Sequence, residues 1–534
     1  MTSHRRTFLK QISVGTAAVA WLPGLTYCPA APSPPAPVLP RSSPEGQGVS
    51  SQGILAFLEA VAQSKHEFHS FMMLRHGHVI AEGWWSPYRA QARHMLYSLS
   101  KSFTSSAVGF AVTEGKLTVD DKVIRFFPGD LPESVSEHLA ALRVKDLLTM
   151  SVGHAQDSTG SIREQENWVK AFLALPIANP PGTTFLYNSG ATYMLSAIVQ
   201  KLTGQKIVDY LTPRLFEPLG IQEMTWETCP RGINTGGWGL SLRTESLAKF
   251  GQLYLQNGVW DQKQILPASW VKEATTFKIQ QPAADLDQMK KHSDWHQGYC
   301  YQFWRCRHNG FRGDGAFGQF AIVLPEKDAV IAITSESAGM QGELDLAWEH
   351  LLPAMKDAAL PADTAAHRDL QQRLSRLLIL PVKANRSWAL AAKISGKTFK
   401  MEPNRLNVQS VSFHFQEDGC DFRLKDDKGE YPIACGLERW IEGETMIPGT
   451  PPTLTYSQTG LGTKVAASAT WQADDTLEMT WRYYETPHHD TITCKFEGEA
   501  VRIQFLNSVT QLSNGHLEKR PVLQGMCPRS EPGR

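Results

Sequence analysis

The sequence has no excess of charge of either sign and only a few cysteines. Lys and Arg total 53 residues, as do Asp and Glu, in a chain of 534 residues. No net field therefore attracts nucleic acid or an anionic membrane surface. The eight cysteines include no Cys-x-x-Cys pair, the usual signal of a zinc or redox site, so we expect no metal and no cofactor. In an exported protein, the seven cysteines besides Cys28 would allow some disulfides and at least one free thiol.

The sequence also has no apolar run near its N-terminus long enough to cross a membrane. The stretch from Ile12 to Leu25 is short and is broken by Pro23, but it follows the pair Arg5-Arg6. A twin-arginine pair before an apolar run is typical of a bacterial export signal, which predicts a periplasmic or extracellular protein. The alternative is that these residues are only a basic N-terminal segment before a disordered tail. Cys28 offers a lipidation site, but the bulky residue before it favours cleavage of the signal near residue 30 instead.

Composition changes along the chain divide it into several parts. The Pro-rich stretch after the signal predicts an extended linker. Mixed helical and strand patterns follow, then an Ala/Leu/Arg-rich helical stretch, and then short alternating runs that predict an all-β barrel or sandwich. The expected parts are a signal, a linker, a catalytic domain, a helical connector, a β-rich accessory domain and a tail, at residues 1–30, 31–49, 50–355, 356–388, 389–515 and 516–534.

The motif with the most chemical content is the Ser-x-x-Lys spacing of Ser98 and Lys101. One helical turn brings the lysine under the serine hydroxyl, where a partly desolvated amine can assist deprotonation of the nucleophile. The spacing alone is weak evidence, because it recurs at Ser246/Lys249 and Ser269/Lys272. A bare match of this kind is usually an ordinary helix surface.

Two histidine-containing stretches have simpler interpretations than metal binding. His76 and His78 fall in the turn of a predicted hairpin between two apolar runs. The run His488-His489-Asp490 falls between two strand-like runs and is predicted to be a solvated turn. We expect no catalytic constellation in this C-terminal β module.

The order of motifs in residues 50–340 resembles the serine β-lactamase/penicillin-recognising superfamily, in particular its class C β-lactamase-like branch of esterases, D-aminopeptidases and 6-aminohexanoate-oligomer hydrolases. The resemblance rests on the motifs Ser98/Lys101, Leu147-Leu148-Thr149-Met150-Ser151, Pro181-Gly182 with Phe185-x-Tyr187, Gly237-Trp238-Gly239 and Ala316-Phe317-Gly318-Gln319. It implies an α/β (α+β) fold with an antiparallel sheet and a helical subdomain. The β module resembles accessory domains of such hydrolases.

The resemblance also implies roles for individual residues. Ser98 would be the nucleophile that forms an acyl-enzyme, Lys101 its base or electrostatic activator, and Tyr187 a second proton-shuttling group whose phenolate is favoured by Lys101. The alternative for Tyr187 is a core aromatic packed under a loop. Substrate-binding roles would fall to side chains beside the tyrosine and to the backbone of the strand opposite, at Asn188, Ser189, Asp314, Gly315 and Ala316.

Two motifs depart from the family pattern. The third position of Tyr-x-Asn is Ser189, which can still hydrogen-bond an acyl amide, or Asn188 can replace it. The chain has no Lys-Thr-Gly, and the corresponding strand is either His308-Asn309-Gly310 or Gly313-Asp314-Gly315, with Arg312 beside the latter.

The altered third motif argues against a substrate carboxylate. The sequence therefore favours an exported serine hydrolase that acts on a small-molecule carboxylic ester or amide, without nucleic acid and without a membrane span. A β-lactamase, a D,D-peptidase or a D-aminopeptidase is the alternative within the family. A non-catalytic, penicillin-binding-like sensor on the same fold is an alternative of another class, although it would have no use for Ser98, Lys101 and Tyr187 together.

Overall fold

The computed structural model describes residues 39–383, 388–447, 450, 462–512 and 518–528. The predicted export signal and most of the Pro-rich linker lie outside these ranges. From Leu39 onward the chain is not a free linker: Leu39 and Val49 are buried, and Arg41 and Val79 form a parallel bridge. No helix in the described ranges has the length and apolarity that a membrane crossing needs.

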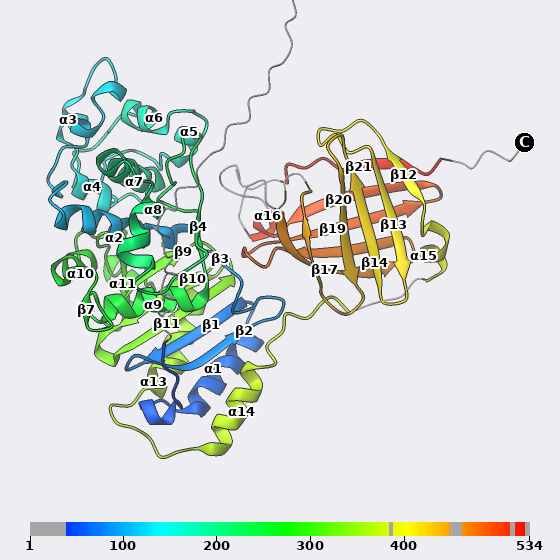
Figure 1. Cartoon of the computed structure of the whole chain (residues 1–534), viewed down its shortest axis with the longest axis horizontal. Helices are drawn as coiled ribbons and strands as arrows, with labels where there is room; N and C mark the ends of the chain where they lie inside the picture. Colours follow the sequence, from blue (N-terminus) through cyan, green and yellow to red (C-terminus); the bar gives the residue numbers. More distant parts are fainter. Residues whose placement is uncertain (1–38, 384–387, 448–449, 451–461, 513–517, 529–534) are drawn as a thin grey trace, which may run out of the picture. The chain divides into compact units, whose positions relative to one another are not determined.

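A six-stranded antiparallel sheet organises the first part of the chain (Figure 1). Its order is β2-β1-β11-β10-β9-β8, with bounds His78–Trp84, Glu67–Arg75, Ala329–Glu336, Gln319–Leu324, Phe311–Gly315 and Trp304–Arg305. The predicted hairpin around His76 and His78 corresponds to β1–β2, and β10–β11 forms a second hairpin. The central strands β10 and β11 are buried over their whole length, which explains their continuous apolar runs.

Helices cover this sheet on both faces. Helix α1 (Ser51–Gln63) places Ile54 and Phe57 in one core cluster with Phe71 and Ile331 of the sheet, and it packs on α14 (Thr364–Leu374). Helix α9 (Thr244–Leu255) packs on β1, β10 and β11. A helical subdomain built around α2 (Ser100–Thr113), α4 (Val144–Leu148) and α7 (Ser189–Thr203) completes this part of the fold. The predicted antiparallel sheet with a helical subdomain is confirmed.

The C-terminal part is a nine-stranded barrel, which decides between the two all-β architectures. Each strand pairs antiparallel with the next in the order β15-β14-β13-β12-β21-β20-β19-β18-β17. A parallel bridge between Gly436 of β15 and Ser468 of β17 closes the ring. The strands are β12, β13, β14, β15, β17, β18, β19, β20 and β21, at Thr398–Met401, Ser410–Gln416, Gly419–Lys425, Glu430–Gly436, Thr463–Ala473, Thr476–Arg482, His489–Glu497, Ala500–Asn507 and Leu523–Met526. A tenth strand, β16 (Ile441–Thr445), pairs with β17 outside the ring.

Side-chain alternation explains the barrel interior. In β19 the residues Ile492, Cys494 and Phe496 are buried while their neighbours are less so, as expected for a strand with one face toward a core. The described cysteines are all free thiols, and six of them are buried, so within these residues no disulfide contributes to the fold.

One expectation for the barrel is wrong. His488 and Asp490 are completely buried, not solvated. The reason is tertiary: the turn between β18 and β19 packs against the β-sheet part of the chain, where Glu336 binds His488, while Asp490 pairs with Arg520.

Candidate active site

Ser98 lies in a short 3-10 turn, η2 (Tyr97–Leu99), immediately before α2. The turn and the helix place Lys101 one turn beyond Ser98, as the spacing predicts. Lys101 Nζ donates to Ser98 Oγ at 2.9 Å. Ser98 is partly exposed, whereas Lys101 is 1% exposed, so the serine borders solvent and its partner does not.

The environment of Lys101 favours a neutral amine near neutral pH. Burial lowers the pKa of Lys101 to about 7, and this effect outweighs the opposing influence of Asp157 and Asp314. Besides Ser98, Lys101 Nζ has two acceptors, Ser189 Oγ at 2.9 Å and the Gly237 carbonyl at 2.7 Å. The Gly237-Trp238-Gly239 turn thus holds the lysine by a backbone oxygen. Such a lysine can accept a proton from the serine next to it.

Tyr187 is the third group at this point. Its ring centroid lies 4.8 Å from Lys101 Nζ and its ring stacks on Trp304 at 5.6 Å between centroids. The expected phenolate is not supported, because burial and the nearby Asp314 raise the pKa of Tyr187 above its usual range, although a hydrogen bond with Ser98 opposes them. Tyr187 is therefore a neutral phenol that can donate a proton, and it contacts both Ser98 and Lys101.

The structure separates the two residues that follow the tyrosine. Ser189 Oγ contacts Lys101 and so occupies the site. Asn188 is 1% exposed and is the N-cap of α7, where its Oδ1 accepts from Ala191 N and from Ser158 Oγ while its Nδ2 contacts His154. Because these partners use its amide oxygen and nitrogen, the Asn188 side chain caps the helix instead of facing a substrate. The predicted substrate-binding role of Asn188 is therefore not supported.

The structure also sets the register of the third motif. His308 and Asn309 lie in the turn between β8 and β9 with positive φ, whereas Gly313-Asp314-Gly315 lies on β9, which packs against η2. Asp314 occupies the position beside Lys101 and Tyr187, and the buried Arg312 pairs with it at 2.9 Å. Ala316 follows directly, between Gly315, which contacts Leu96, and Phe317, whose ring lies 5.3 Å from that of Tyr97.

Gly315 provides a first test of this geometry. A Cβ at Gly315 would lie 2.0 Å from the Leu96 carbonyl oxygen, so β9 or the Ser98 turn would have to move. We expect Gly315→Ala to lower kcat at least about 10-fold and to lower stability by about 1–3 kcal/mol. Hydrolysis assays and thermal melts measure both quantities. Gly129→Ala, where nothing lies within 4 Å of the added Cβ, should leave both unchanged; equal effects at the two glycines would refute the assigned geometry.

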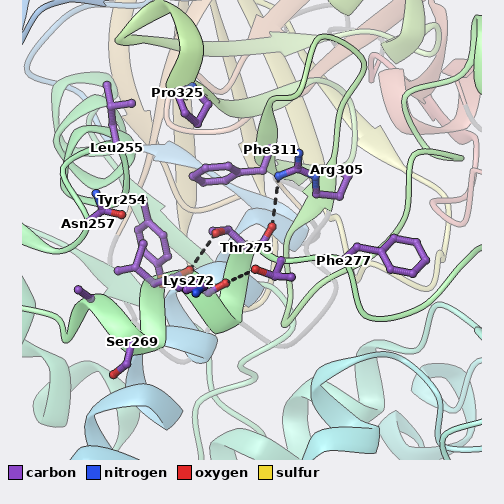
Figure 2. A pocket seen from close by; sticks show the side chains of 13 residues that line it. Tyr254, Leu255, Asn257, Ser269, Lys272, Thr275, Phe277, Arg305, Phe311 and Pro325 are labelled. Carbon is purple, nitrogen blue, oxygen red and sulfur yellow. Dashed lines mark hydrogen bonds between the residues drawn. The ribbon is translucent and has the colours of Figure 1, made fainter.

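The other two Ser-x-x-Lys matches lie in different surroundings. Ser246 and Lys249 are buried on α9, which faces the sheet. Ser269 and Lys272 are exposed on α10 (Ala268–Thr275), at the edge of a pocket of about 700 Å³. Figure 2 shows that the lining of this pocket also includes Arg305, whose guanidinium donates to the Thr275 carbonyl. Neither pair has the arrangement of buried amine and accessible hydroxyl found at Ser98.

Sequence reasoning assigned no role in this site to three of its participants. Asp157 accepts the backbone N–H of Ser189 at 3.0 Å, Trp304 stacks on Tyr187, and the Gly237 carbonyl binds Lys101. None has a local sequence signal for these roles. Each comes from a segment distant from Ser98 in the chain, and only the packing of the helical subdomain against β8 and β9 brings them together.

Comparisons with known proteins show which family this chain resembles. A family model described as Beta-lactamase matches residues 59–355. The 6-aminohexanoate-dimer hydrolase of Paenarthrobacter ureafaciens is 25% identical over 282 residues, which are 49% of this chain and 71% of that protein. A second relative is a protein of Escherichia coli (strain K12) with the provisional name D-alanyl-D-alanine carboxypeptidase. It is 27% identical over 153 residues, which are 26% of this chain and 35% of that protein.

A solved structure with a long alignment is also similar to this chain. The octameric penicillin-binding protein homologue from Pyrococcus abyssi is 15% identical, with a TM-score of 0.47, and the alignment covers 89% of this chain and 99% of that one. The residues that match the family model include Ser98, Lys101, Tyr187 and the strand β9.

Proposed function

The chain belongs to the beta-lactamase family of hydrolases, and from this premise we propose that it is an exported serine hydrolase that cleaves a carboxylic ester or a small amide through an acyl-enzyme on Ser98. The observation that carries the proposal is the 2.9 Å contact between the partly exposed Ser98 hydroxyl and the buried amine of Lys101. The chemistry needs a nucleophile that substrate can reach and a base that is neutral near neutral pH, and this pair supplies both.

The first half-reaction uses the three side chains in turn. Neutral Lys101 takes the proton of Ser98 Oγ while Oγ attacks the substrate carbonyl carbon. The carbonyl oxygen becomes an oxyanion, for which the backbone N–H groups of Ser98 and Ala316 are the proposed donors; one such donor contributes about 3–4 kcal/mol at the transition state. The Tyr187 phenol is placed to donate a proton to the departing alcohol or amine, and the proton on Lys101 restores it.

The second half-reaction releases the acyl group. Water enters in place of the leaving group, loses a proton to the neutral base and attacks the acyl carbon. The bond to Ser98 Oγ then breaks, Oγ regains a proton, and a carboxylic acid leaves. Ser189 lies beside the base and is positioned to hydrogen-bond the acyl portion of the substrate.

The proposed substrate class follows from the charges around the nucleophile. A substrate carboxylate placed at β9 would meet Asp314 instead of a lysine, and Arg312 is already paired with that aspartate. This arrangement supports an uncharged acyl group near the scissile bond. The inclusion of amides in the proposed substrate class has separate support, because a dimer of 6-aminohexanoate, the substrate that gives the first relative its name, is joined by an amide bond.

A substrate panel tests the proposal. We expect hydrolysis of nitrophenyl esters or amino-acid amides to exceed that of nitrocefin at least about 10-fold in kcat/KM. The carboxylate of the lactam would lie near the carboxylate of Asp314, and the repulsion between the two weakens binding. Rapid nitrocefin turnover would instead support the β-lactamase alternative. Failure of the purified protein to react with both a fluorophosphonate and a penicillin probe would support a non-catalytic sensor.

A further inference from the structure

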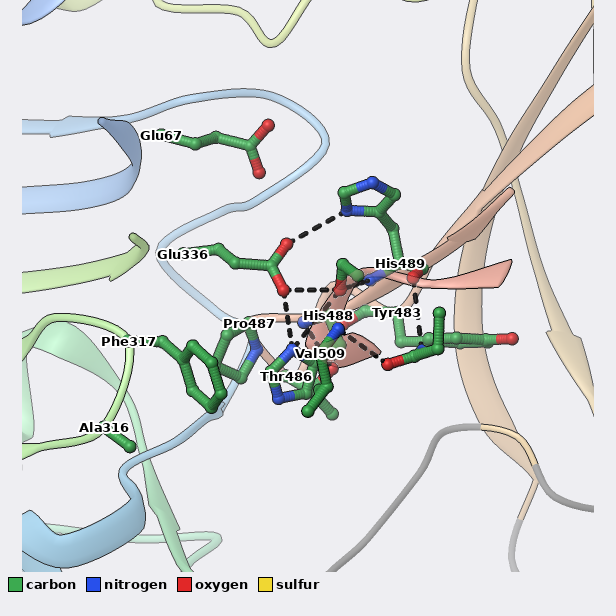
Figure 3. Close-up of polar contacts among 12 residues, drawn as sticks. Glu67, Ala316, Phe317, Glu336, Tyr483, Thr486, Pro487, His488, His489 and Val509 are labelled. Atoms are coloured by element: carbon green, nitrogen blue, oxygen red, sulfur yellow. Dashed lines mark hydrogen bonds and ion pairs between the residues drawn. The ribbon is translucent and has the colours of Figure 1, made fainter. Parts of the chain in front are cut away.

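The turn of the barrel between β18 and β19 carries His488, which lies beside Glu336 of the sheet in Figure 3 and contacts the segment that carries the nucleophile. The Met95 N–H donates to the Glu485 carbonyl at 2.9 Å, and Arg93 pairs with Glu485 at 3.3 Å. Three residues beyond Glu485, His488 contacts Tyr97, the neighbour of Ser98. A residue more than 380 positions later in the sequence thus lies directly behind the Ser98 turn.

His488 forms a connected chain of hydrogen bonds. Its Nδ1 contacts Glu336 Oε1 at 2.6 Å, and its Nε2 contacts the hydroxyl of Tyr97. Burial raises the pKa of Tyr97, so Tyr97 is a neutral phenol. Nδ1 of His488 faces the carboxylate and donates to it, and Nε2 shares a hydrogen bond with the phenol. Tyr97, His488 and Glu336 therefore form one continuous hydrogen-bonded connection.

The carboxylate at the end of this chain is itself held firmly. Glu336 is the last residue of β11, and its side chain is 2% exposed. Its second oxygen contacts His489 Nδ1 at 3.0 Å, and the hydroxyl of Ser508 donates to the first. Burial would raise the pKa of Glu336, but the bonds from His488 and His489 outweigh burial and lower that pKa. The barrel and the sheet therefore meet at a carboxylate that stays ionised.

A metal ion is a poorer interpretation of this cluster. One ligand atom each of Glu67, Glu336 and His489 lie within 4.8 Å of one another. Arg482, however, already forms a two-bond ion pair with Glu67, at 2.6 and 3.1 Å. With Arg482 on one carboxylate and two histidines on the other, the charges and lone pairs have partners within the protein.

The backbone at Tyr97 explains why such a connection matters. Tyr97 has a φ of 48°, in the left-handed region that a bulky side chain avoids. Such a conformation costs about 1–3 kcal/mol and persists only where surrounding contacts enforce it. The Tyr97 ring has contacts on two sides, since Phe317 lies 5.3 Å and His488 5.6 Å from it between centroids. These contacts hold the peptide that orients Ser98 toward Lys101.

We infer that His488 of the barrel is a positioning residue for the Ser98 nucleophile, acting through its hydrogen bond to Tyr97 and anchored by Glu336. The inference rests on the proposed function for its effect on catalysis, but the contact that it invokes is independent of the substrate. The barrel is then part of the catalytic apparatus: its β18–β19 turn keeps the strained Tyr97 backbone in the conformation that presents Ser98.

The test is a double-mutant cycle in the full chain. Tyr97→Phe removes only the hydroxyl, and His488→Leu removes the imidazole. We expect each to lower kcat about 10- to 100-fold with KM within about 3-fold, because the nucleophile loses orientation while the substrate site remains. The double variant should be no slower than the slower single variant, since both remove one interaction. His488→Gln, whose amide can still hydrogen-bond the hydroxyl of Tyr97, should recover part of the loss.

A control and a second measurement separate positioning from general loss of stability. Tyr483→Phe removes a buried hydroxyl of the same turn that donates to Asp490 instead of contacting Tyr97, and it should leave kcat unchanged. Hydrogen exchange of the peptide spanning residues 94–103 should accelerate in the Tyr97 and His488 variants and not in Tyr483→Phe. Additive losses in the cycle, an equal loss in Tyr483→Phe, or unchanged exchange would overturn the inference. A wild-type protein without activity would refute the proposed function, while the exchange data would still decide the role of His488.

Discussion

Ser98→Ala is expected to lower hydrolysis at least about 10³-fold and to abolish covalent labelling by a fluorophosphonate, because no other group at this position can form the acyl bond. The substitution removes one oxygen from a partly exposed turn residue, so the fold and its thermal stability should change little. Mass spectrometry of the labelled protein would locate the probe on the peptide that contains Ser98.

The chain provides a matched control for this substitution. Ser269 has the same spacing to a lysine, at Lys272, but both are exposed on α10. Ser269→Ala should keep full activity and full labelling. Labelling that survived in Ser98→Ala would place the nucleophile elsewhere, and loss of labelling in Ser269→Ala would contradict the choice among the three motifs.

Lys101→Arg is expected to lower kcat/KM at least about 10³-fold, although it preserves the positive charge. A guanidinium stays protonated at all working pH values and cannot serve as a base. The result would distinguish a proton-accepting lysine from one that acts only by its charge. Lys101→Met, which keeps the length of the side chain without a titrating group, should be as inactive as Lys101→Arg, whereas a positively charged activator would be partly replaced by arginine.

The pH dependence of the wild-type enzyme tests the same role. The pKa of Lys101 is about 7, so the amine is mostly protonated at pH 6 and mostly neutral at pH 8. If the neutral amine is the base, kcat/KM rises with pH and reaches half of its plateau near pH 7. Since burial is the cause of the lowered pKa, the rise should occur well below the usual range of lysine. A flat profile between pH 6 and 9 would refute the role.

Several features of the site were predictable because their signals are local or ordered along the chain. The Ser98–Lys101 contact follows from helical spacing, and the hairpins β1–β2 and β10–β11 follow from apolar runs separated by turn residues. The choice of Ser98 over Ser246 and Ser269 came from the order of motifs, and the structure shows the physical difference in burial and access among the three.

Other features could not be predicted, because they depend on which groups become neighbours. Asn188 and Ser189 are adjacent and both polar, yet the helix start binds one and leaves the other beside Lys101. The phenolate expected for Tyr187 failed for a related reason. Burial lowers the pKa of Lys101, so the positive charge that should favour the phenolate is only partly present. Burial of Tyr187 and the nearby Asp314 of β9 both disfavour the phenolate anion.

By itself, the sequence determined the catalytic spacing, the family and the succession of a mixed domain and a β module, since these depend on local periodicity and on motif order. Only the tertiary structure decided the surroundings of these groups: the burial that lowers the pKa of Lys101, the β9 register that brings in Asp314, and the packing that buries His488 behind Tyr97. The physical reason is that solvation and electrostatic energies depend on distances between segments far apart in the chain, which no local pattern records.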